Sequence, residues 1–455
     1  QSSFKPFLVR VTVIRDGFFS KQMNTPKLIR LFLLAGSLVV LLTANAGDPF
    51  VSVKNGRFML GNLPYYYVGV NYWYGGLEAN SAKGQSRIRE ELDFLQKKGV
   101  SNLRVLAGAE GTGQINGVPR VEPALQPAPG VFREDLLKGL DFLLAEMGQR
   151  KMKAIIYFSN NWEWSGGFLQ YLNWNGMMAD SILQRKLSWD EMRDYVKEFY
   201  NCGNCISQYE AQLKLLVNRR NSITQKKYTD DPAIMSWEIA NEPRPMRPVS
   251  IDAYKKFIHV TAALIKSLDP NHLVTTGAEG DVGAENMEVY KAIHADKEID
   301  YLTIHIWPKN WGWFSDTAIG RSFDQVLEKT GDYINRHRSA AKELGKPLVI
   351  EEFGLPRDRH SFSLQSTTGY RDKYYAFVFA YLTDKEKNNG IISGANFWAF
   401  SGKGRPSHRQ LLWAKGDDVL GDPPVEEQGL NSVFDTDRTT WNVVTSCTGK
   451  LKKKK

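Results

Sequence analysis

The sequence has little cysteine and no long apolar run, and each shortage argues against a class of protein. Three cysteines in 455 residues are too few for a disulfide-dense scaffold. No apolar run reaches the roughly 20 residues that a membrane-spanning helix needs, and no glycine-rich nucleotide-binding loop follows the first predicted strand. The chain is 42% hydrophobic and 12% aromatic, which indicates a globular protein with a large core.

The apolar run Leu31–Leu42 lies near the start of the chain. It follows Met23 and two basic residues and precedes a small-x-small sequence that ends at Ala46, which is the pattern of a secretory signal peptide. We therefore expect residues 23–46 to be cleaved after Ala46, and the protein to be secreted without further membrane association. A membrane anchor is the alternative, although the run is short for one.

The body of the chain also has almost no excess of positive over negative residues. Residues 1–46 hold six Lys or Arg against one Asp, and residues 450–455 hold five Lys, out of a formal net charge of +9. We expect residues 1–22 and 450–455 to be non-native additions, for instance untranslated regions of a transcript that were read as protein. One domain over residues 47–449 remains. That body has a net charge of −1, so nothing favours a nucleic-acid partner, and we expect a monomer.

The cysteines comprise Cys202 and Cys205 in a C-x-x-C spacing, and Cys447 near the end of the chain. In an exported protein the spaced pair is expected to form a local disulfide, with a bond from Cys447 to one of them as the alternative. A redox motif or a zinc half-site would need thioredoxin-like features or further ligands that the sequence does not supply.

Short runs rich in β-branched and aromatic residues alternate with longer helix-patterned segments, which is typical of βαβ units on a parallel sheet. The eight predicted strands are Tyr66–Val70, Asn102–Leu106, Lys153–Phe158, Ile234–Ile239, Leu273–Thr276, Tyr301–His305, Leu348–Ile350 and Ala395–Trp398. The seven predicted helices are Gln85–Lys98, Arg133–Arg150, Ser188–Arg219, Ser250–Leu268, Glu285–Ile293, Ser322–Leu344 and Gly369–Lys387.

Eight such strands close most simply into a single (β/α)₈ TIM barrel, because closure leaves no sheet edge exposed. An open doubly wound sheet is the alternative. The segment Val51–Gly61 carries Asn-Gly between two short apolar runs and predicts a hairpin that plugs the bottom of the barrel. Ser401–Pro424 is polar and predicts a long loop after strand eight.

Polar and aromatic residues gather at the carboxyl ends of the predicted strands, where such a barrel builds its active site. These residues are Arg104, Asn241, Glu242, Arg244, Glu279, His305, Trp307, Glu351, Glu352 and Trp398. Glycoside hydrolysis requires two carboxyl groups, one to protonate the departing oxygen and one to attack the anomeric carbon or activate water. Tryptophan rings suit the apolar faces of sugars. The alternatives are ordinary surface acids and a non-catalytic sugar-binding module, against which the presence of both carboxylates argues.

Two motifs resemble glycoside hydrolase family five, whose members place catalytic glutamates after strands four and seven of a (β/α)₈ barrel. They are Ser236–Arg244, which contains Asn-Glu-Pro-Arg, and Ile350–Gly354, which contains Glu-Phe-Gly. Thr276–Gly280, His305–Pro308 and Asn310–Gly312 are similar to the endo-β-1,4-mannanase branch. The resemblance covers most of residues 50 to 445.

The resemblance implies that Glu242 is the acid/base and Glu352 the nucleophile of a retaining enzyme. Strand alternation would then turn Glu351 to the opposite face. Asn241 matches the residue that binds the sugar 2-hydroxyl. Arg104 and His305 are expected near the nucleophile, where they would favour its charged form.

The resemblance also implies a set of sugar-binding residues. Trp398 would form the floor under the attacked sugar, Arg244 would lie on the leaving-group side, and Glu279 would contact a sugar on the other side. Expected aromatic platforms are Trp162, Trp164, Trp73, Trp311 and Trp313.

One position departs from the family pattern, which commonly has tyrosine two residues after the strand-six histidine. Here Trp307 stands at that position. Either its indole N–H binds the nucleophile, or the orientation of that carboxylate relies more on Arg104. We expect a mannan endo-1,4-β-mannosidase that needs no metal or cofactor and acts on β-mannan and manno-oligosaccharides, with a β-1,4-glucanase of the same family as the alternative.

Overall fold

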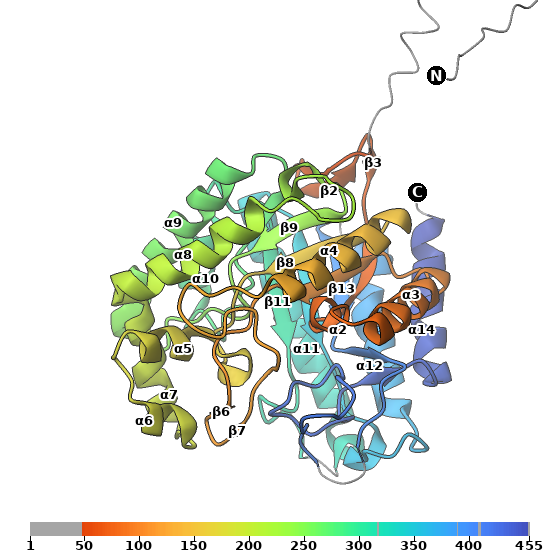
Figure 1. Ribbon diagram of the computed structural model, residues 1–455. Helices are drawn as coiled ribbons and strands as arrows, with labels where there is room; N and C mark the ends of the chain where they lie inside the picture. Colours follow the sequence, from red (N-terminus) through yellow and green to blue (C-terminus); the bar gives the residue numbers. More distant parts are fainter. Residues whose placement is uncertain (1–47, 316–317, 389, 408–410, 454–455) are drawn as a thin grey trace, which may run out of the picture. The chain divides into compact units, whose positions relative to one another are not determined.

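The structure is a computed structural model that describes residues 48–315, 318–388, 390–407 and 411–453, so the predicted signal peptide lies outside it. Pro49–Lys455 form one compact unit around an eight-stranded parallel sheet with the order β10-β9-β8-β5-β4-β13-β12-β11 (Figure 1). The strands are β4 (Tyr67–Asn71), β5 (Asn102–Leu106), β8 (Lys153–Tyr157), β9 (Ile234–Glu238), β10 (Leu273–Thr275), β11 (Leu302–Ile306), β12 (Leu348–Phe353) and β13 (Ile392–Phe397).

The first and last strands of this order, β10 and β11, are brought together by backbone hydrogen bonds. Asp300 N donates to Val274 O at 2.8 Å, and His305 N donates to Glu279 O at 2.8 Å. The sheet therefore curls into the predicted barrel. All eight predicted strands are present, but β12 continues through the two glutamates to Phe353.

Helices surround the strands (Figure 1). The α-helices are α2 (Gly75–Glu78), α3 (Ala82–Lys97), α4 (Glu134–Gln149), α5 (Gly167–Trp174), α6 (Asp180–Gln184), α7 (Trp189–Val196), α8 (Gly203–Val217), α9 (Ile251–Leu268), α10 (Met287–His294), α11 (Ile319–Leu344), α12 (Gly369–Thr383), α13 (Lys385–Asn388) and α14 (Arg438–Lys452). In α3 the apolar residues at helical spacing form one buried face, as expected, because Ile88, Leu92 and Leu95 are all buried. No helix in the described part of the chain is long and apolar enough to cross a membrane.

The predicted continuous helix Ser188–Arg219 is wrong. α7 begins with a capping box made by Ser188 and Glu191 and ends at Val196, and a 3₁₀ turn follows. Cys202 then takes an extended conformation (φ −89°, ψ 92°) before α8 begins. A disulfide joins Cys202 to Cys205, which fixes the start of α8 to the residue that breaks the helix.

Helix α14 lies after the last predicted helix and was not predicted. Its buried residues Trp441, Val444 and Leu451 recur at helical spacing, a signal that was present in the sequence. Thr448 Oγ1 donates to Lys98 O at 2.9 Å, so the helix packs against the loop that leads into β5. The folded unit therefore continues beyond residue 449, the predicted end of the domain.

A small antiparallel sheet covers the bottom of the barrel, as predicted. It consists of β1 (Val51–Lys54), β2 (Arg57–Leu60) and β3 (Leu63–Pro64). Phe58 is fully buried and its ring lies 5.2 Å from that of Tyr301. The apolar cluster there is Val51, Phe58, Tyr65, Tyr67, Ile155, Met235, Leu273, Tyr301 and Val349.

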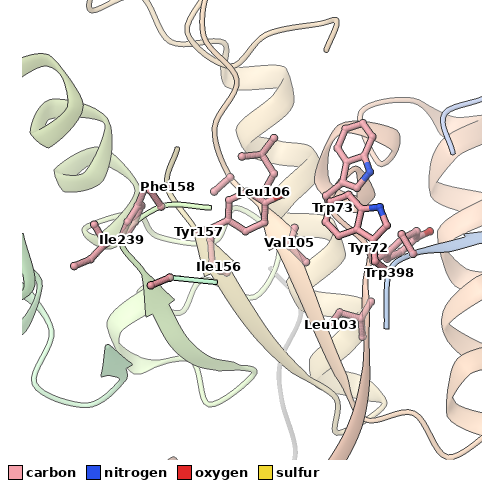
Figure 2. Packing of buried hydrophobic residues seen from close by; sticks show 14 of the residues in the cluster. Tyr72, Trp73, Leu103, Val105, Leu106, Ile156, Tyr157, Phe158, Ile239 and Trp398 are labelled. Atoms are coloured by element: carbon pink, nitrogen blue, oxygen red, sulfur yellow. The ribbon is translucent and has the colours of Figure 1, made fainter. Parts of the chain in front are cut away.

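A larger apolar cluster fills the rest of the unit. Figure 2 shows a part of it, in which Val105 and Leu106 of β5 lie near Ile156 and Tyr157 of β8. Two further short ribbons, β6 (Gln114–Ile115) with β7 (Val118–Pro119) and β14 (Phe400–Gly402) with β15 (Val433–Phe434), lie in the loops after the strands.

Candidate active site

A cavity of about 440 Å³ lies at the carboxyl ends of the barrel strands. Six of its lining residues are tryptophans, namely Trp162, Trp164, Trp189, Trp307, Trp311 and Trp398. Glu242 and Glu352 lie in the same cavity. An aromatic wall around two acids is the setting that sugar cleavage requires.

Glu242 and Glu352 face each other although 110 residues separate them in the chain. One carboxylate oxygen of each lies within 4.8 Å of the other and of a ring nitrogen of His305. Glu242 follows β9 in a left-handed conformation (φ +52°), and its N–H donates to Gly277 O after β10. Such strained backbone is typical of functional positions.

Both oxygens of Glu242 have hydrogen-bonding neighbours. Trp162 Nε1 donates to Oε2 at 2.5 Å, and His305 Nδ1 lies 2.6 Å from Oε1. Trp162, predicted as a platform for a further sugar, therefore also orients the acid/base candidate. This contact had no signal in the sequence.

Glu352 is held at both oxygens as well. Arg104 Nη1 donates to Oε1, and Trp307 Nε1 donates to Oε2 at 3.1 Å. Trp307 thus binds the nucleophile candidate and acts together with Arg104, so the two alternatives considered for this position both apply. Burial raises the pKa of Glu352 well above that of a free carboxyl group, while the positive charge of Arg104 opposes this shift.

Arg104 is the centre of the polar network beneath the cavity. It is fully buried, its guanidinium lies 4.6 Å from the centre of the Tyr157 ring, and it donates to both oxygens of Glu238. Glu238 had no predicted role. A charged residue inside the otherwise uncharged buried strand β9 was the available signal.

The prediction that Glu351 points to the opposite face is wrong. Ile304 pairs with Ile350 and His305 pairs with Glu352, so Glu351 is the extra residue of a β-bulge. A bulge interrupts the alternation of side chains on which the prediction relied. Glu351 Oε2 consequently lies 3.7 Å from Arg104 Nε inside the barrel.

His305 lies near both glutamates, but it does not supply a positive charge that would favour the ionised form of the nucleophile. Its burial, together with Arg104 nearby, lowers its pKa well below the usual value for histidine. Its Nδ1 is 3.4 Å from Glu352 and closer to Glu242. The imidazole is therefore a neutral hydrogen-bonding partner of the acid/base candidate.

Arg244 and Glu279 were expected on opposite sides of the bound sugar, but they form an ion pair with each other. They follow the neighbouring strands β9 and β10, which brings them to the same side of the cavity. The Arg244 guanidinium lies 4.8 Å from the Trp162 ring and 5.9 Å from the Trp189 ring. Burial raises the pKa of Glu279 to about 7, although Arg244 opposes the shift.

The structure divides the predicted aromatic platforms. Trp162, Trp164 and Trp311 line the cavity, whereas Trp73 and Trp313 do not, and Trp398, the predicted floor, lines it as well. Trp73 is 1% exposed and its indole N–H donates to Gly421 O at 2.8 Å. Asn241 lines the cavity, accepts a hydrogen bond from Arg104 and donates to Asn160 Oδ1 at 3.0 Å.

Several residues of the cavity were not predicted, among them Trp189 and Glu426. Trp189, 51% exposed, begins α7 and lies 6.0 Å from Trp162. Glu426 follows the predicted loop after strand eight, and its Oε2 is buried without a hydrogen-bonding partner in the described residues. Burial, with Asp422 nearby, raises the pKa of Glu426 to about 8. Glu426 could have been found from its position after strand eight. Trp189 gave no such signal, because it lies within the predicted helix Ser188–Arg219.

Glu242, His305 and Glu352 are also close enough to hold a metal ion together. Carboxylate and imidazole groups are suitable ligands for zinc or similar metals. Among the described residues this is the one such group, and it coincides with the catalytic pair. A cation bound there would occupy the oxygens that have to act on a sugar.

Replacing Trp307 by phenylalanine removes the indole N–H but keeps an aromatic ring in the wall. A hydrogen bond to a charged group is worth about 1.5–3 kcal/mol, so we expect kcat to fall by roughly 10- to 100-fold. Trp174→Phe, a half-buried tryptophan on α5 outside the cavity, is the matched control. Wild-type kinetics in Trp307→Phe would remove this contact from the mechanism.

Sugar-cleaving enzymes of the glycoside hydrolase class set two carboxyl groups across the scissile bond, and this cavity has the same arrangement within a (β/α)₈ barrel. A family model described as GH family 5 beta-mannosidase-like matches residues 48–455. The chain belongs to this family of glycoside hydrolases, which confirms the resemblance noted in its motifs.

Several known proteins are similar over most of the chain. Mannan endo-1,4-beta-mannosidase 1 of Oryza sativa is 30% identical over 80% of this chain and 81% of its own length. Mannan endo-1,4-beta-mannosidase 7 of Arabidopsis thaliana is 30% identical over 77% of each chain. The crystal structure of a family 5 mannosidase from Rhizomucor miehei matches with a TM-score of 0.80 and 31% identity, over 89% of this chain and 98% of that one.

Proposed function

We propose that this protein hydrolyses internal β-1,4-mannosidic bonds of mannan, glucomannan and galactomannan with retention of configuration. The observation that carries the proposal is the approach of Glu242 and Glu352 to within 4.8 Å. Retaining enzymes hold their carboxyl groups about 5–5.5 Å apart, whereas inverting enzymes leave about 6.5–9.5 Å for a water molecule. The short separation supports direct attack by one carboxylate.

The proposed reaction has two steps, which the contacts of the two glutamates support. Glu352, fixed by Arg104 and Trp307, attacks the anomeric carbon, while Glu242 gives its proton to the departing oxygen. This forms a glycosyl ester on Glu352. Glu242 then takes a proton from water, which attacks the same carbon and releases the sugar and the Glu352 carboxylate.

The choice of mannose rests on the relatives, which are named for mannan or as mannosidases. The β-1,4-glucanase alternative differs in the orientation of the 2-hydroxyl, which is axial in mannose and equatorial in glucose. Asn241, expected to bind that hydroxyl, lines the cavity. Nothing in its contacts favours glucose.

A second candidate function is the release of single mannose units from chain ends. Pro423, Val425 and Glu426 line the catalytic cavity, while Asp422 and Pro424 of the same segment line a neighbouring cavity of about 150 Å³. The segment therefore lies between the two cavities and bounds the catalytic cavity there. A boundary at that position favours a chain end over a continuous polymer, and the Rhizomucor miehei relative is named a mannosidase.

Product analysis separates these functions. Incubation with mannohexaose and galactomannan is expected to yield a mixture of short oligosaccharides and a rapid fall in viscosity if internal bonds are cut. Release of mannose alone, without a fall in viscosity, supports the second candidate. Hydrolysis of carboxymethylcellulose with no action on either mannan substrate would overturn the proposed sugar.

We also propose that the enzyme acts outside the cell. The support is the sequence pattern of residues 23–46. N-terminal sequencing of the protein recovered from culture medium is expected to begin after Ala46, and retention inside the cell would contradict export.

A further inference from the structure

Glu351 and Glu238 form a second pair of carboxyl groups inside the barrel, beneath the catalytic pair. Both side chains are fully buried. Glu351 Oε2 lies 3.7 Å from Arg104 Nε and 3.6 Å from His305 Nε2, both beyond hydrogen-bonding distance. Neither oxygen of Glu351 accepts a hydrogen bond from another side chain or backbone group of the described residues.

Arg104 has no N–H group left for Glu351. A guanidinium carries five N–H groups, and all five donate to other side chains. The acceptors are Glu238, which takes two, and Asn71, Asn241 and Glu352, which take one each. Glu351 therefore lies beside a positive charge whose hydrogen-bonding capacity is used up.

A buried carboxylate without a donor is far less stable than a protonated carboxyl group. The group that can take a hydrogen bond from Glu351 is the carboxyl group of Glu238, whose Oε2 accepts from Arg104 Nε at 2.9 Å while Glu351 Oε2 lies 3.7 Å from the same nitrogen. A hydrogen bond between the two carboxyl groups requires a proton on one of them. Glu238 already accepts two N–H groups of Arg104, so the proton belongs on Glu351.

We propose that Glu351 is a protonated positioning residue, which donates to ionised Glu238 and thereby fixes Arg104 against Glu352. The proposal rests on the proposed function in that Glu352 is the nucleophile. One negative charge on the inner pair leaves Arg104 able to stabilise ionised Glu352. A second charge on Glu351 would repel the nucleophile and favour its protonated form. The direction of the Glu351 pKa agrees, because burial and Glu238 raise it well above the usual range.

The other titratable groups around Glu351 do not supply a compensating charge. They come from several strands and from α10, and they are Tyr67, Arg104, Tyr157, Glu238, Tyr290, Tyr301, His305 and Glu352. Burial raises the pKa of each tyrosine and lowers that of His305, so these groups are neutral. The charged groups of this network are thus Arg104, which is positive, and Glu238 and Glu352, which are negative.

Three variants test the assignment. Glu351→Met keeps the volume but removes the donor to Glu238, and we expect kcat to fall by roughly 10- to 100-fold with KM within about threefold of wild type. Glu351→Gln supplies an N–H donor without charge and is expected to restore kcat to within about fivefold. Glu238→Gln, the same substitution on the partner, removes the charge that holds Arg104 and is expected to lower kcat by about 100-fold or more.

The pH profile provides a readout that a merely structural role would not move. The acidic limb of kcat/KM reports the ionisation of Glu352. If Glu351 is neutral, Glu351→Gln leaves this limb in place. A limb displaced to lower pH would show that a negative charge had been removed and would overturn the proposal, as would Glu351→Gln being no better than Glu351→Met, or Glu351→Met having wild-type kcat.

An infrared difference spectrum makes the test independent of activity. The spectrum of wild type minus that of Glu351→Gln, both at neutral pH, is expected to contain the C=O band of a protonated carboxyl group. Loss of carboxylate bands instead would overturn the assignment even if a variant folds poorly. If wild type hydrolyses no mannan substrate, the proposed function fails while the infrared result still decides the state of Glu351.

Discussion

Replacing Glu352 by glutamine is expected to lower kcat on mannan by about 10⁴-fold or more, because loss of a catalytic nucleophile leaves binding and electrostatics alone. The amide keeps the size of the carboxyl group and can still contact Arg104 and Trp307, which hold Glu352 in the wild type. It cannot form the glycosyl ester. Steady-state hydrolysis of galactomannan, with KM measured in the same assay, checks this result.

The control for Glu352→Gln is the same substitution at Glu343. That residue lies on the exposed face of α11, where it pairs with Lys291. Wild-type turnover in Glu343→Gln shows that a glutamine for glutamate exchange is harmless in itself. Residual turnover of a tenth of wild type or more in Glu352→Gln would assign the nucleophile to another group.

Replacing Glu242 by glutamine is expected to lower kcat on mannan by roughly 10²- to 10⁴-fold, the usual contribution of general acid–base catalysis. The substitution removes the proton donor while Trp162 and His305, the present neighbours of Glu242, remain in place. An aryl β-mannoside with a strongly acidic leaving group needs no protonation. Its first step, followed as a burst of released phenol, is expected to stay within about tenfold of wild type.

The contrast between the two substrates is the internal control for Glu242. Equal losses on mannan and on the activated aryl mannoside would contradict the role as acid. A small added nucleophile such as azide, which needs no general base, is expected to restore the second step for the aryl substrate. Wild-type hydrolysis of mannan in Glu242→Gln would remove Glu242 from the chemistry altogether.

The barrel and the two principal acids were predictable because they depend on patterns that extend along the chain. Alternating apolar runs and helical segments defined eight strands, and only the ends of these strands moved by a few residues. The motifs around Glu242 and Glu352 place each acid at the end of such a strand. Closure of the barrel then brings them together across 110 residues.

Contacts that depend on local irregularities could not be predicted. Alternation implied that Glu351 would leave the site, but a single extra residue in β12 turned it into the barrel. The same limitation applies to the break between α7, which ends at Val196, and α8, because a continuous helical pattern gave no sign of it. The pairing of Arg244 with Glu279 follows from adjacent strand ends and required the sheet order.

The structure also changes the electrostatic account of the site. His305 was expected to favour the charged form of the nucleophile, but it is buried and neutral next to Glu242. Arg104 is left as the cation that faces Glu352, and Glu238 holds it in place. The ionised nucleophile is present above the raised pKa of Glu352 and is lost as the pH falls through it, so the acidic limb of kcat/KM is expected above that of an exposed carboxyl group.

The central claim is that Glu242 and Glu352 perform a double displacement with retention. Proton NMR of a manno-oligosaccharide digest, recorded before the released sugars equilibrate in solution, measures the configuration of the newly formed chain end. The account predicts that the β-anomer accumulates first and that the α-anomer appears later by mutarotation. Initial formation of the α-anomer would mean that water attacks directly, and it would contradict the assignment of Glu352 as the nucleophile.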